Sequence, residues 1–384
     1  MDFMKKIIKK VLKNHKGLQN YIYTVYKKYR YTKSIFKTLI FAIKGLFLTY
    51  TPSYKINRGE QIKKSFSKAK ININNDDNFV FSIDPYKLLY SDLSTIENTT
   101  IDYEICLNKS LNDLKKEIEN LKSSDYKNTQ LNAIEAIEIL LNKVIQSLKK
   151  SDKKNKEKYI KYFENIKDRK AESFEEALQR ILFYNQVLWQ SGHNLNGLGR
   201  LDKILDSYYK NDKKMDKKKA SKLIEKFIGI LHSYYWLKSS ALLGDTGQII
   251  ILGGMDEKKH YFSNDLTYIF IEAIKKLQLP DPKVLLRISK NTPRDLIKLS
   301  IDCIKTGVGC PLFANDDVII PKLIKFGYEK NDAYNYVTSA CWEPLIPNKS
   351  VEQNNIRSMV FMRPFNEMLN SEDLSKIDNT KDLI

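Results

Sequence analysis

Cysteine and histidine are both scarce in this sequence. Its 384 residues include four cysteines and four histidines, and neither a C-x-x-C pair nor a zinc-type spacing occurs among them. We therefore expect no bound metal. A chain of this length with so few cysteines and no clear export signal is typical of a cytoplasmic protein, in which thiols stay reduced.

Long apolar runs are lacking, and so are acidic residues near the start of the chain. The apolar run at residues 35–50 is interrupted by Lys37 and Lys44, which leaves it too short and too charged to span a bilayer. Residues 1–60 hold 14 Lys and Arg against 2 Asp and Glu, whereas the rest of the chain is close to charge balance. We therefore divide the chain into a basic N-terminal arm, 1–60, and one domain, 61–384.

Lysine pairs alternate with apolar and tyrosine positions in this arm, a pattern that predicts a basic helical segment. We interpret the arm first as a solvated helix that packs on the main domain. Contact with an anionic membrane surface stays open as an alternative. Binding to nucleic acid is the less favoured alternative, because no RNP or helix-turn-helix pattern accompanies the basic residues.

Helical and strand-like patterns alternate through most of the domain. Residues 61–128 are an exception, since they are polar and irregular, with a loop or linker expected at 72–78. Ser173 and Glu176 form a capping box that begins a mostly apolar helix. Apolar periodicity predicts further helices over 129–150, 217–238, 266–277, 292–307 and 318–326, and strands over 248–252, 284–288 and 308–313. This alternation predicts an α/β architecture with helices packed around a sheet or barrel.

One short segment, residues 334–347, combines a thiol with a nearby carboxylate. It reads YNYVTSACWEPLIP and places Cys341 two residues before Glu343, with Pro344 and Pro347 closing the segment. Proline neither continues a helix nor donates to a central strand, so we expect an ordered loop here. The loop is a candidate site; the alternative is a buried, inert thiol.

Seven short motifs follow one another along the chain. They are SFEEALQ (173–179), GLGRLDKILDSYYKND (197–212), GQIIILGG (247–254), NDLTYIFIEAIKKL (264–277), NTPRDLI (291–297), TGVGCPLFANDDVIIPKLIKFGY (306–328) and SACWEP (339–344). In this order and at this spacing, over residues 129–347, they resemble the pyruvate formate-lyase-like domain of glycyl radical enzymes. The resemblance implies a helix-rich α/β fold, with this chain forming part of a ten-stranded barrel: the first half-barrel plus the cysteine loop.

The resemblance also implies roles for individual residues. Cys341 lies at the position of the cysteine that becomes a thiyl radical, and Glu343 matches the base of the branches that eliminate water, an amine or a sulfonate group. Burial near an apolar site could raise the proton affinity of such a carboxylate; the alternative is a carboxylate that caps backbone amides. Trp342 is expected to shape the substrate pocket, or else simply to pack. His193 is a candidate substrate contact and proton-transfer partner, with a structural histidine at a helix end as the alternative.

Other residues in these motifs are interpreted as structural. Gly197 and Gly199 are expected in a tight turn, because no phosphate-binding glycine pattern is present. Cys106, Cys303 and Cys310 are interpreted as buried thiols. A set of polar residues within the motifs is read as satisfying backbone groups at turns: Arg200, Asp202, Gln248, Asn315 and Asp316.

The radical itself has no matching position in this sequence. Family members store it on a glycine in a motif near R-V-x-G-Y, which does not occur here. We therefore expect that a C-terminal segment or a second chain supplies the glycine and the second half-barrel, and that the isolated chain is inactive. The resemblance further implies a radical S-adenosylmethionine activating enzyme, oxygen sensitivity and a small-molecule substrate; a homodimer stays open.

The expected function is that of a glycyl radical lyase acting on a small hydroxylated or carboxylated metabolite, as a dehydratase or a C–N, C–S or C–C lyase. Acyl transfer of the pyruvate formate-lyase type is disfavoured, because Ala340 and Trp342 flank Cys341 where that reaction needs a second cysteine. The competing hypothesis is a truncated, radical-incompetent protein with a binding or scaffolding role through its basic arm.

Overall fold

The computed structural model describes residues 58–73, 78–82, 98–191, 195–233, 247–340 and 342–350, with short pieces between 25 and 43 and single residues at 366 and 370. The chain divides into two units, Met1–Val351 and Glu352–Ile384. All the elements discussed below belong to the first unit. The basic arm predicted at residues 1–60 lies almost entirely outside the described ranges.

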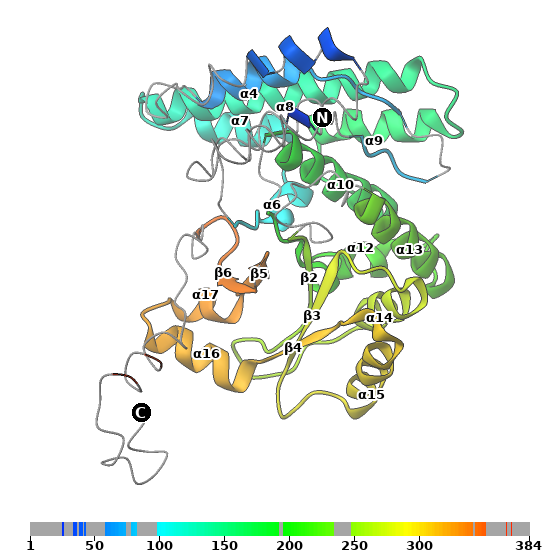
Figure 1. Ribbon diagram of the computed structural model, residues 1–384, viewed down its shortest axis with the longest axis vertical. Coiled ribbons are helices and arrows are strands. Elements are labelled where there is room, and N and C mark those ends of the chain that lie inside the picture. Colours follow the sequence, from blue (N-terminus) through cyan, green and yellow to red (C-terminus); the bar gives the residue numbers. More distant parts are fainter. Residues whose placement is uncertain are drawn as a thin grey trace. The chain divides into compact units, whose positions relative to one another are not determined.

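Four parallel strands form the sheet, in the order β1, β2, β3, β4. Figure 1 labels the last three of them. Their bounds are Gly199–Arg200, Ile249–Gly253, Lys283–Ile288 and Leu312–Asn315. Parallel neighbours need long crossover connections. Helices provide them: α13 (Lys217–Ser233), α14 (Asp265–Leu277), and α15 (Arg294–Cys303) with the π-helical turn η4 (Ile304–Val308). The predicted alternation of helices and short strands is confirmed.

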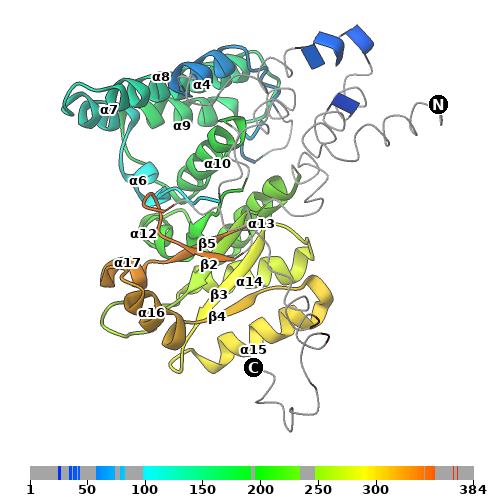
Figure 2. The ribbon, with the colours of Figure 1, turned by 60° about the vertical axis from the view of Figure 1, so that its left-hand side comes forward.

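Strand β2 is buried on both faces, as its wholly apolar sequence predicts. Ile250 and Leu252 point into the main core, to which α13 and α14 also contribute. Ile249 and Ile251 point the other way and pack with Val337, in the strand β5 described below. Figure 2 shows these helices and β5 on opposite sides of β2 and β3. The sheet therefore separates the helical layer of α13 and α14 from β5.

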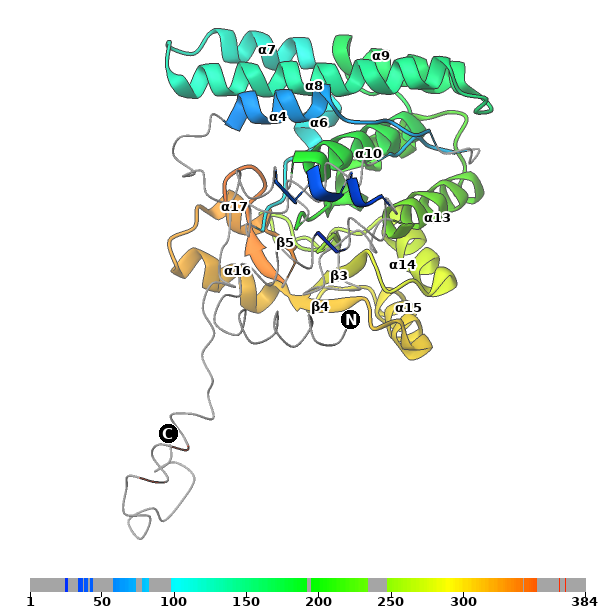
Figure 3. The same cartoon turned by 45° about the horizontal axis from the view of Figure 1, so that its top comes forward.

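A group of helices formed by the first part of the domain packs along α8 (Asp125–Lys149), which confirms the helix predicted at 129–150 (Figure 3). Its neighbours are α4 (Arg58–Ser67), α7 (Leu111–Glu119) and α9 (Lys156–Asp168). The prediction that residues 61–128 are irregular is wrong, because α4, α6 (Tyr103–Asn108) and α7 lie there. Side-chain caps on α6 and α7 explain the difference: Asp102 accepts from two backbone amides, and Ser110 forms a capping box with Asp113.

Helix α10 (Phe174–Ser191) begins where the capping box predicts, and the backbone N–H of Glu176 donates to Ser173 Oγ. Most of its residues are buried, so it contacts other elements on several sides. The remaining helices are α11 (Leu201–Ile204), α12 (Asp206–Asn211), α16 (Asp316–Lys325) and α17 (Lys330–Tyr334).

The strand predicted at 308–313 is displaced along the chain. Gly307 and Gly309 have φ angles of 87° and 76°, a left-handed conformation that glycine adopts without strain. They end the turn η4 and delay extended structure until Leu312, where β4 begins. The prediction identified the strand but placed its start too early.

Two buried arginines connect the C-terminal ends of the strands. Arg287 of β3 donates from Nε and Nη2 to Asp316 at 2.9 Å, and Arg200 donates from Nη2 to the carbonyl oxygen of Gly253 at 2.7 Å. Asp202 accepts from the N–H of Gly253 at 2.7 Å. Burial and the nearby Arg287 guanidinium lower the pKa of Arg200 to about 10. Arg200, Asp202 and Asp316 thus have structural roles, as the sequence predicts. The prediction placed them at turns, whereas in the structure they join the ends of strands to the starts of helices.

Candidate active site

The segment around Cys341 is an antiparallel hairpin. Strand β5 (Val337–Ser339) pairs with β6 (Glu343–Leu345), and Ser339 lies opposite Glu343. Of the three residues that join the strands, Cys341 lies outside the described part of the chain. Its neighbours Ala340 and Trp342 have φ angles of 43° and 73°. The N–H of Trp342 donates to the carbonyl oxygen of Ser339 at 2.9 Å, which closes the turn.

The prediction of a loop throughout this segment is wrong for Val337–Ser339, which form β5, and for Glu343–Leu345, which form β6. In an antiparallel pair, the N–H groups of alternate residues point away from the partner strand. Pro344 lies opposite Thr338, between the pairs Val337–Leu345 and Ser339–Glu343. Proline is tolerated at such a position because no ladder hydrogen bond needs its missing N–H. The hairpin therefore gives Glu343 a fixed backbone.

Two segments that precede strands β1 and β2 support the hairpin. The N–H of Ala340 donates to the carbonyl oxygen of Gly247 at 3.0 Å, and Ser339 Oγ donates to that of Leu195 at 3.1 Å. Gly197 allows the close approach: a Cβ atom there would lie 2.3 Å from Thr100 Oγ1 and 2.5 Å from the carbonyl oxygen of Thr338. This glycine therefore serves close packing of backbone, rather than a tight turn or a phosphate.

Glu343 is the one predicted catalytic residue whose side chain the structure describes. It is only 5% exposed, and its Oε1 accepts a hydrogen bond of 2.9 Å from Asn98 Nδ2. Asn98 itself is fully buried. Sequence reasoning missed this asparagine, because it lies in a polar stretch with no apolar period and no motif that marks it.

Trp342 lies beside Glu343 with a half-buried ring. The Lys283 ammonium group lies 5.7 Å from the ring centroid, within the range of a cation–π contact. The ring also packs at the edge of the apolar cluster formed by Ile249, Ile251 and their neighbours. These contacts fix the side chain at the turn, and its predicted role in shaping a pocket stays a prediction.

A polar cluster adjoins the supports of the hairpin. Asn185 of α10 donates from Nδ2 to Asn196 Oδ1 and to Gln248 Oε1, both at 2.9 Å. Asn196 follows Leu195 directly and Gln248 follows Gly247, so this network braces both support segments from the helical side. His193, the other predicted substrate contact, lies outside the described residues.

The three remaining cysteines are buried free thiols. Burial raises the pKa of Cys106 to about 12 and that of Cys303 to about 11, and it also raises the pKa of Cys310. These thiols stay protonated at neutral pH and are suited to packing, as expected from the sequence.

Among the described residues, no group of three or more His, Cys, Asp or Glu side chains is placed to hold a metal ion. Within the same ranges, no helix is both long and apolar enough to cross a membrane.

The chain is similar in sequence to proteins named as dehydratases and lyases. A probable dehydratase, YbiW of Escherichia coli, is 30% identical over 196 residues, which cover 46% of this chain and 24% of that protein. Isethionate sulfite-lyase of Desulfovibrio desulfuricans is 24% identical over 282 residues, covering 65% of this chain and 34% of the relative. The chain therefore spans between about a quarter and a third of the length of these relatives.

Solved structures agree at the level of the fold. The glycerol-bound B12-independent glycerol dehydratase from Clostridium butyricum matches with a TM-score of 0.61 at 23% identity, covering 75% of this chain and 38% of that one. Hydroxyproline dehydratase from Clostridioides difficile matches with a TM-score of 0.56 at 22% identity, covering 65% and 36%. The described part of the chain thus has the fold of part of such a barrel, which confirms the predicted fold class.

The family model described as pyruvate formate lyase-like matches residues 90–371, well over half of the chain. That range contains all seven motifs, the sheet and the hairpin. The chain therefore belongs to the pyruvate formate lyase-like family of glycyl radical enzymes, whose members similar to it include dehydratases and lyases.

Proposed function

We propose that this chain carries the cysteine half of the active site of a glycyl radical lyase. In this proposal Cys341 is the hydrogen-abstracting thiol and Glu343 the base. The observation that carries it is the placement of Glu343: a buried carboxylate, fixed on β6 and hydrogen-bonded by Asn98, two residues after Cys341. A base must be held in place to act on one particular hydroxyl group.

The proposed chemistry balances within one cycle. The Cys341 thiyl radical takes a hydrogen atom from a substrate carbon and becomes a thiol, leaving a carbon radical. Glu343 accepts the proton of the hydroxyl group on that carbon, and the adjacent C–O, C–N or C–S bond breaks heterolytically. The leaving group departs with the bonding electron pair and takes up the proton that Glu343 accepted, which restores the carboxylate. The product radical then takes the hydrogen atom back from the thiol, which restores the thiyl radical.

The proposal assigns the substrate to the small hydroxylated or carboxylated compounds. Relatives named for isethionate and for trans-4-hydroxy-L-proline, and the fold relative named for glycerol, support a hydroxylated substrate. Trp342 and His193 keep their predicted roles as substrate contacts. A second cysteine next to Cys341, which acyl transfer would need, is absent from the sequence.

The radical is assigned to residues outside this sequence, because the sequence contains no R-V-x-G-Y motif. When present, the glycyl radical supplies the oxidising equivalent that generates the Cys341 thiyl radical. We further propose a radical S-adenosylmethionine activating enzyme as partner and a cytoplasmic, anaerobic setting.

The test is to produce the chain without oxygen, together with the polypeptide that carries the glycyl radical motif and an activating enzyme. Electron paramagnetic resonance detects the radical, and turnover is assayed on glycerol, propane-1,2-diol, isethionate and trans-4-hydroxy-L-proline. Cys341→Ala should keep the radical signal and abolish turnover. Glu343→Gln should keep the signal and lower kcat by about 10²-fold or more.

Cys303→Ala is the matched control, since it removes a buried thiol from α15 and should leave kcat unchanged. Turnover by the Cys341→Ala protein would refute the assignment. Formation of no glycyl radical under any of these conditions would favour the non-catalytic hypothesis instead.

A further inference from the structure

Four large apolar side chains share one side of a short helical piece in the basic arm. The described residues between 35 and 43 are helical, and the N–H of Thr38 donates to the carbonyl oxygen of Ser34 at 3.1 Å, one turn back. Each residue of a helix is rotated by about 100° from the one before, so positions 35, 36, 39 and 43 fall within an arc of about 100°. We call these residues the apolar face of the arm: Ile35, Phe36, Leu39 and Ile43.

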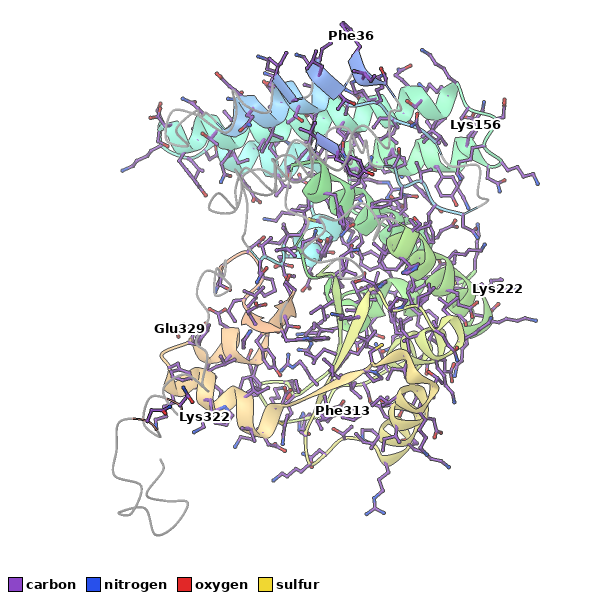
Figure 4. All side chains as sticks on the ribbon, viewed as in Figure 1. Phe36, Lys156, Lys222, Phe313, Lys322 and Glu329 are labelled. Carbon is purple, nitrogen blue, oxygen red and sulfur yellow. The ribbon has the colours of Figure 1, made fainter. Side chains whose placement is uncertain are left out.

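The apolar face is exposed, whereas a polar residue of the same piece is buried. Ile35 and Phe36 are 75% and 72% exposed, and Leu39 and Ile43 are 56% and 48% exposed. Thr38 is only 8% exposed, and its hydroxyl donates to a backbone carbonyl oxygen at 2.7 Å. Figure 4 labels Phe36. This arrangement is the reverse of the usual one, in which a surface helix turns its apolar residues inward.

Such a cluster differs from the scattered apolar residues found on most protein surfaces. A single exposed Ile or Leu needs no explanation, because apolar atoms make up much of any folded surface. Several large apolar side chains gathered on one helix face mark a surface that makes contact with a partner. We therefore infer that something other than water covers the apolar face of the arm.

The charge of the surrounding sequence narrows the choice of partner. Residues 27–44 contain six Lys and Arg and no Asp or Glu, and the whole arm, 1–60, holds 14 Lys and Arg against 2 Asp and Glu. Two copies of such an arm repel each other, which disfavours a second copy of this chain as the partner. An anionic partner is favoured, because charge attraction and apolar contact then act together.

A lipid surface fits this combination better than nucleic acid does. Aliphatic side chains can enter the boundary between headgroups and acyl chains, while Lys and Arg stay among anionic headgroups. Proteins that bind single-stranded nucleic acid stack bases on aromatic rings, and Phe36 is the one aromatic residue of this face. Lys37 and Lys44 interrupt the apolar run in the sequence, which favours contact along the surface over a span through it.

We propose that the apolar face of the arm binds an anionic lipid membrane. Its four side chains enter the boundary below the headgroups, at a depth of about 5–10 Å, and the basic residues of the arm attract the negative headgroups. The chain is thereby held at the membrane surface. This binding does not depend on the proposed function, since it involves neither Cys341 nor Glu343.

Vesicle flotation with the full 384-residue chain tests the proposal. The chain should float with vesicles of phosphatidylcholine and phosphatidylglycerol. Vesicles of phosphatidylcholine alone, or high salt, should weaken binding by about tenfold or more, because the charge attraction is lost. The double variant Phe36→Ser, Leu39→Ser should bind the mixed vesicles about tenfold or more weakly, because two apolar contacts are lost.

Phe326→Ser is the matched control. Phe326 is 81% exposed and follows the last residue of α16, so the variant removes an exposed ring from another part of the chain. It should bind the mixed vesicles as the wild type does. Urea midpoints should match that of the wild type, because all the replaced side chains are exposed. If the double variant does not fold, Ile35→Ser with Ile43→Ser tests the same face.

Insertion has a direct spectroscopic readout. When the Phe36→Trp protein binds the mixed vesicles, its tryptophan emission should shift to shorter wavelength after the wild-type spectrum is subtracted. Lipids brominated on their acyl chains should quench this emission. A contact with headgroups alone would give neither effect and would overturn the proposed insertion.

Three other results would also overturn the proposal. One is the absence of binding to the mixed vesicles, and another is equal binding by the wild type and the double variant, because basic residues alone would then account for it. The third is a face that serves a different partner: self-association or binding of duplex DNA would be lost in the double variant while vesicle binding is unchanged.

Discussion

Arg287 and Asp316 form a fully buried ion pair at the C-terminal end of the sheet. The guanidinium group also donates from Nη1 to the carbonyl oxygens of Tyr334 and Tyr336, at 3.0 and 3.1 Å. Tyr336 in turn donates its hydroxyl to Asp316 at 2.8 Å, and its ring lies 4.0 Å from the Arg287 guanidinium carbon. The pair thus links β3 and α16 to the chain entering β5, and so to the hairpin.

Removing one partner of this pair should be costly. Asp316→Ala leaves the Arg287 guanidinium buried without its carboxylate, and we expect the free energy of unfolding to fall by about 3–5 kcal/mol. Urea denaturation followed by circular dichroism measures it. Asp332→Ala, which removes the partner of the exposed Lys349, should cost less than about 1 kcal/mol. Equal losses in the two variants would contradict this account. Tyr336→Phe removes only the hydrogen bond from Tyr336 to Asp316, and it should lower the free energy of unfolding by about 1 kcal/mol.

At the scale of single elements, the start of α7 allows a prediction about pH. Asp113 completes the capping box with Ser110, whose hydroxyl and N–H lower the pKa of this carboxyl below its usual value of 3.8. A lowered carboxyl pKa contributes stability that is present above the unfolded value and is lost as pH falls through the folded value. In Ser110→Ala the pKa of Asp113 should return toward 3.8, as measured by ¹³C NMR of the labelled aspartate carboxyl groups.

The stability difference between wild type and Ser110→Ala should accordingly shrink as the pH is lowered from 5 toward 3. Ser124→Ala is the control: Ser124 caps α8 by accepting from the N–H of Lys127, without a reciprocal acidic partner. The loss of stability in Ser124→Ala should therefore not change as Asp113 becomes protonated. A stability difference for Ser110→Ala that stays constant over this pH range would contradict the assigned role of Asp113.

The elements that could be predicted from the sequence are those in which apolar period and caps agree. The helix at α8 and the buried strand at β2 are of this kind. Those that were missed depend on signals of one or two residues: the caps that start α6 and α7, and the glycines at 307 and 309 that delay β4. A proline in β6 also misled the prediction, because its tolerance depends on the register of the partner strand, which the sequence does not reveal.

At the scale of the molecule, β4 is the outermost strand of the sheet on its side, among the strands that the structure describes. Leu312 and Phe313 on this strand are each 40% exposed, and Figure 4 labels Phe313. Exposed apolar edge strands promote association between chains. We therefore expect the purified chain to self-associate through this edge.

Phe313→Lys should reduce this self-association several-fold, because a charged side chain on an edge strand disfavours pairing. Analytical ultracentrifugation of the purified chain over a range of concentrations measures it. Val318→Lys is the control, since Val318 is 54% exposed but lies on α16. If both variants reduce association equally, exposed apolar area in general is responsible and the strand edge has no special part.

The residues of the candidate site differ in whether they could be predicted from the sequence. Cys341 and Glu343 are two residues apart, so a local motif suffices to find them. Asn98 could not be found in this way, because only the folded chain brings it to Glu343. The same holds for Leu195 and Gly247, which support the hairpin through their backbone carbonyl groups, so that no side-chain motif marks this role in the sequence.

This long-range support has a consequence for the order of folding. The hairpin makes its supporting contacts with residues near 98, 195 and 247, so each contact closes a loop of roughly a hundred residues or more. Closing such loops is entropically costly and slow compared with forming a helix. We therefore expect the contacts around Glu343 to form late in folding, after the helices and the sheet.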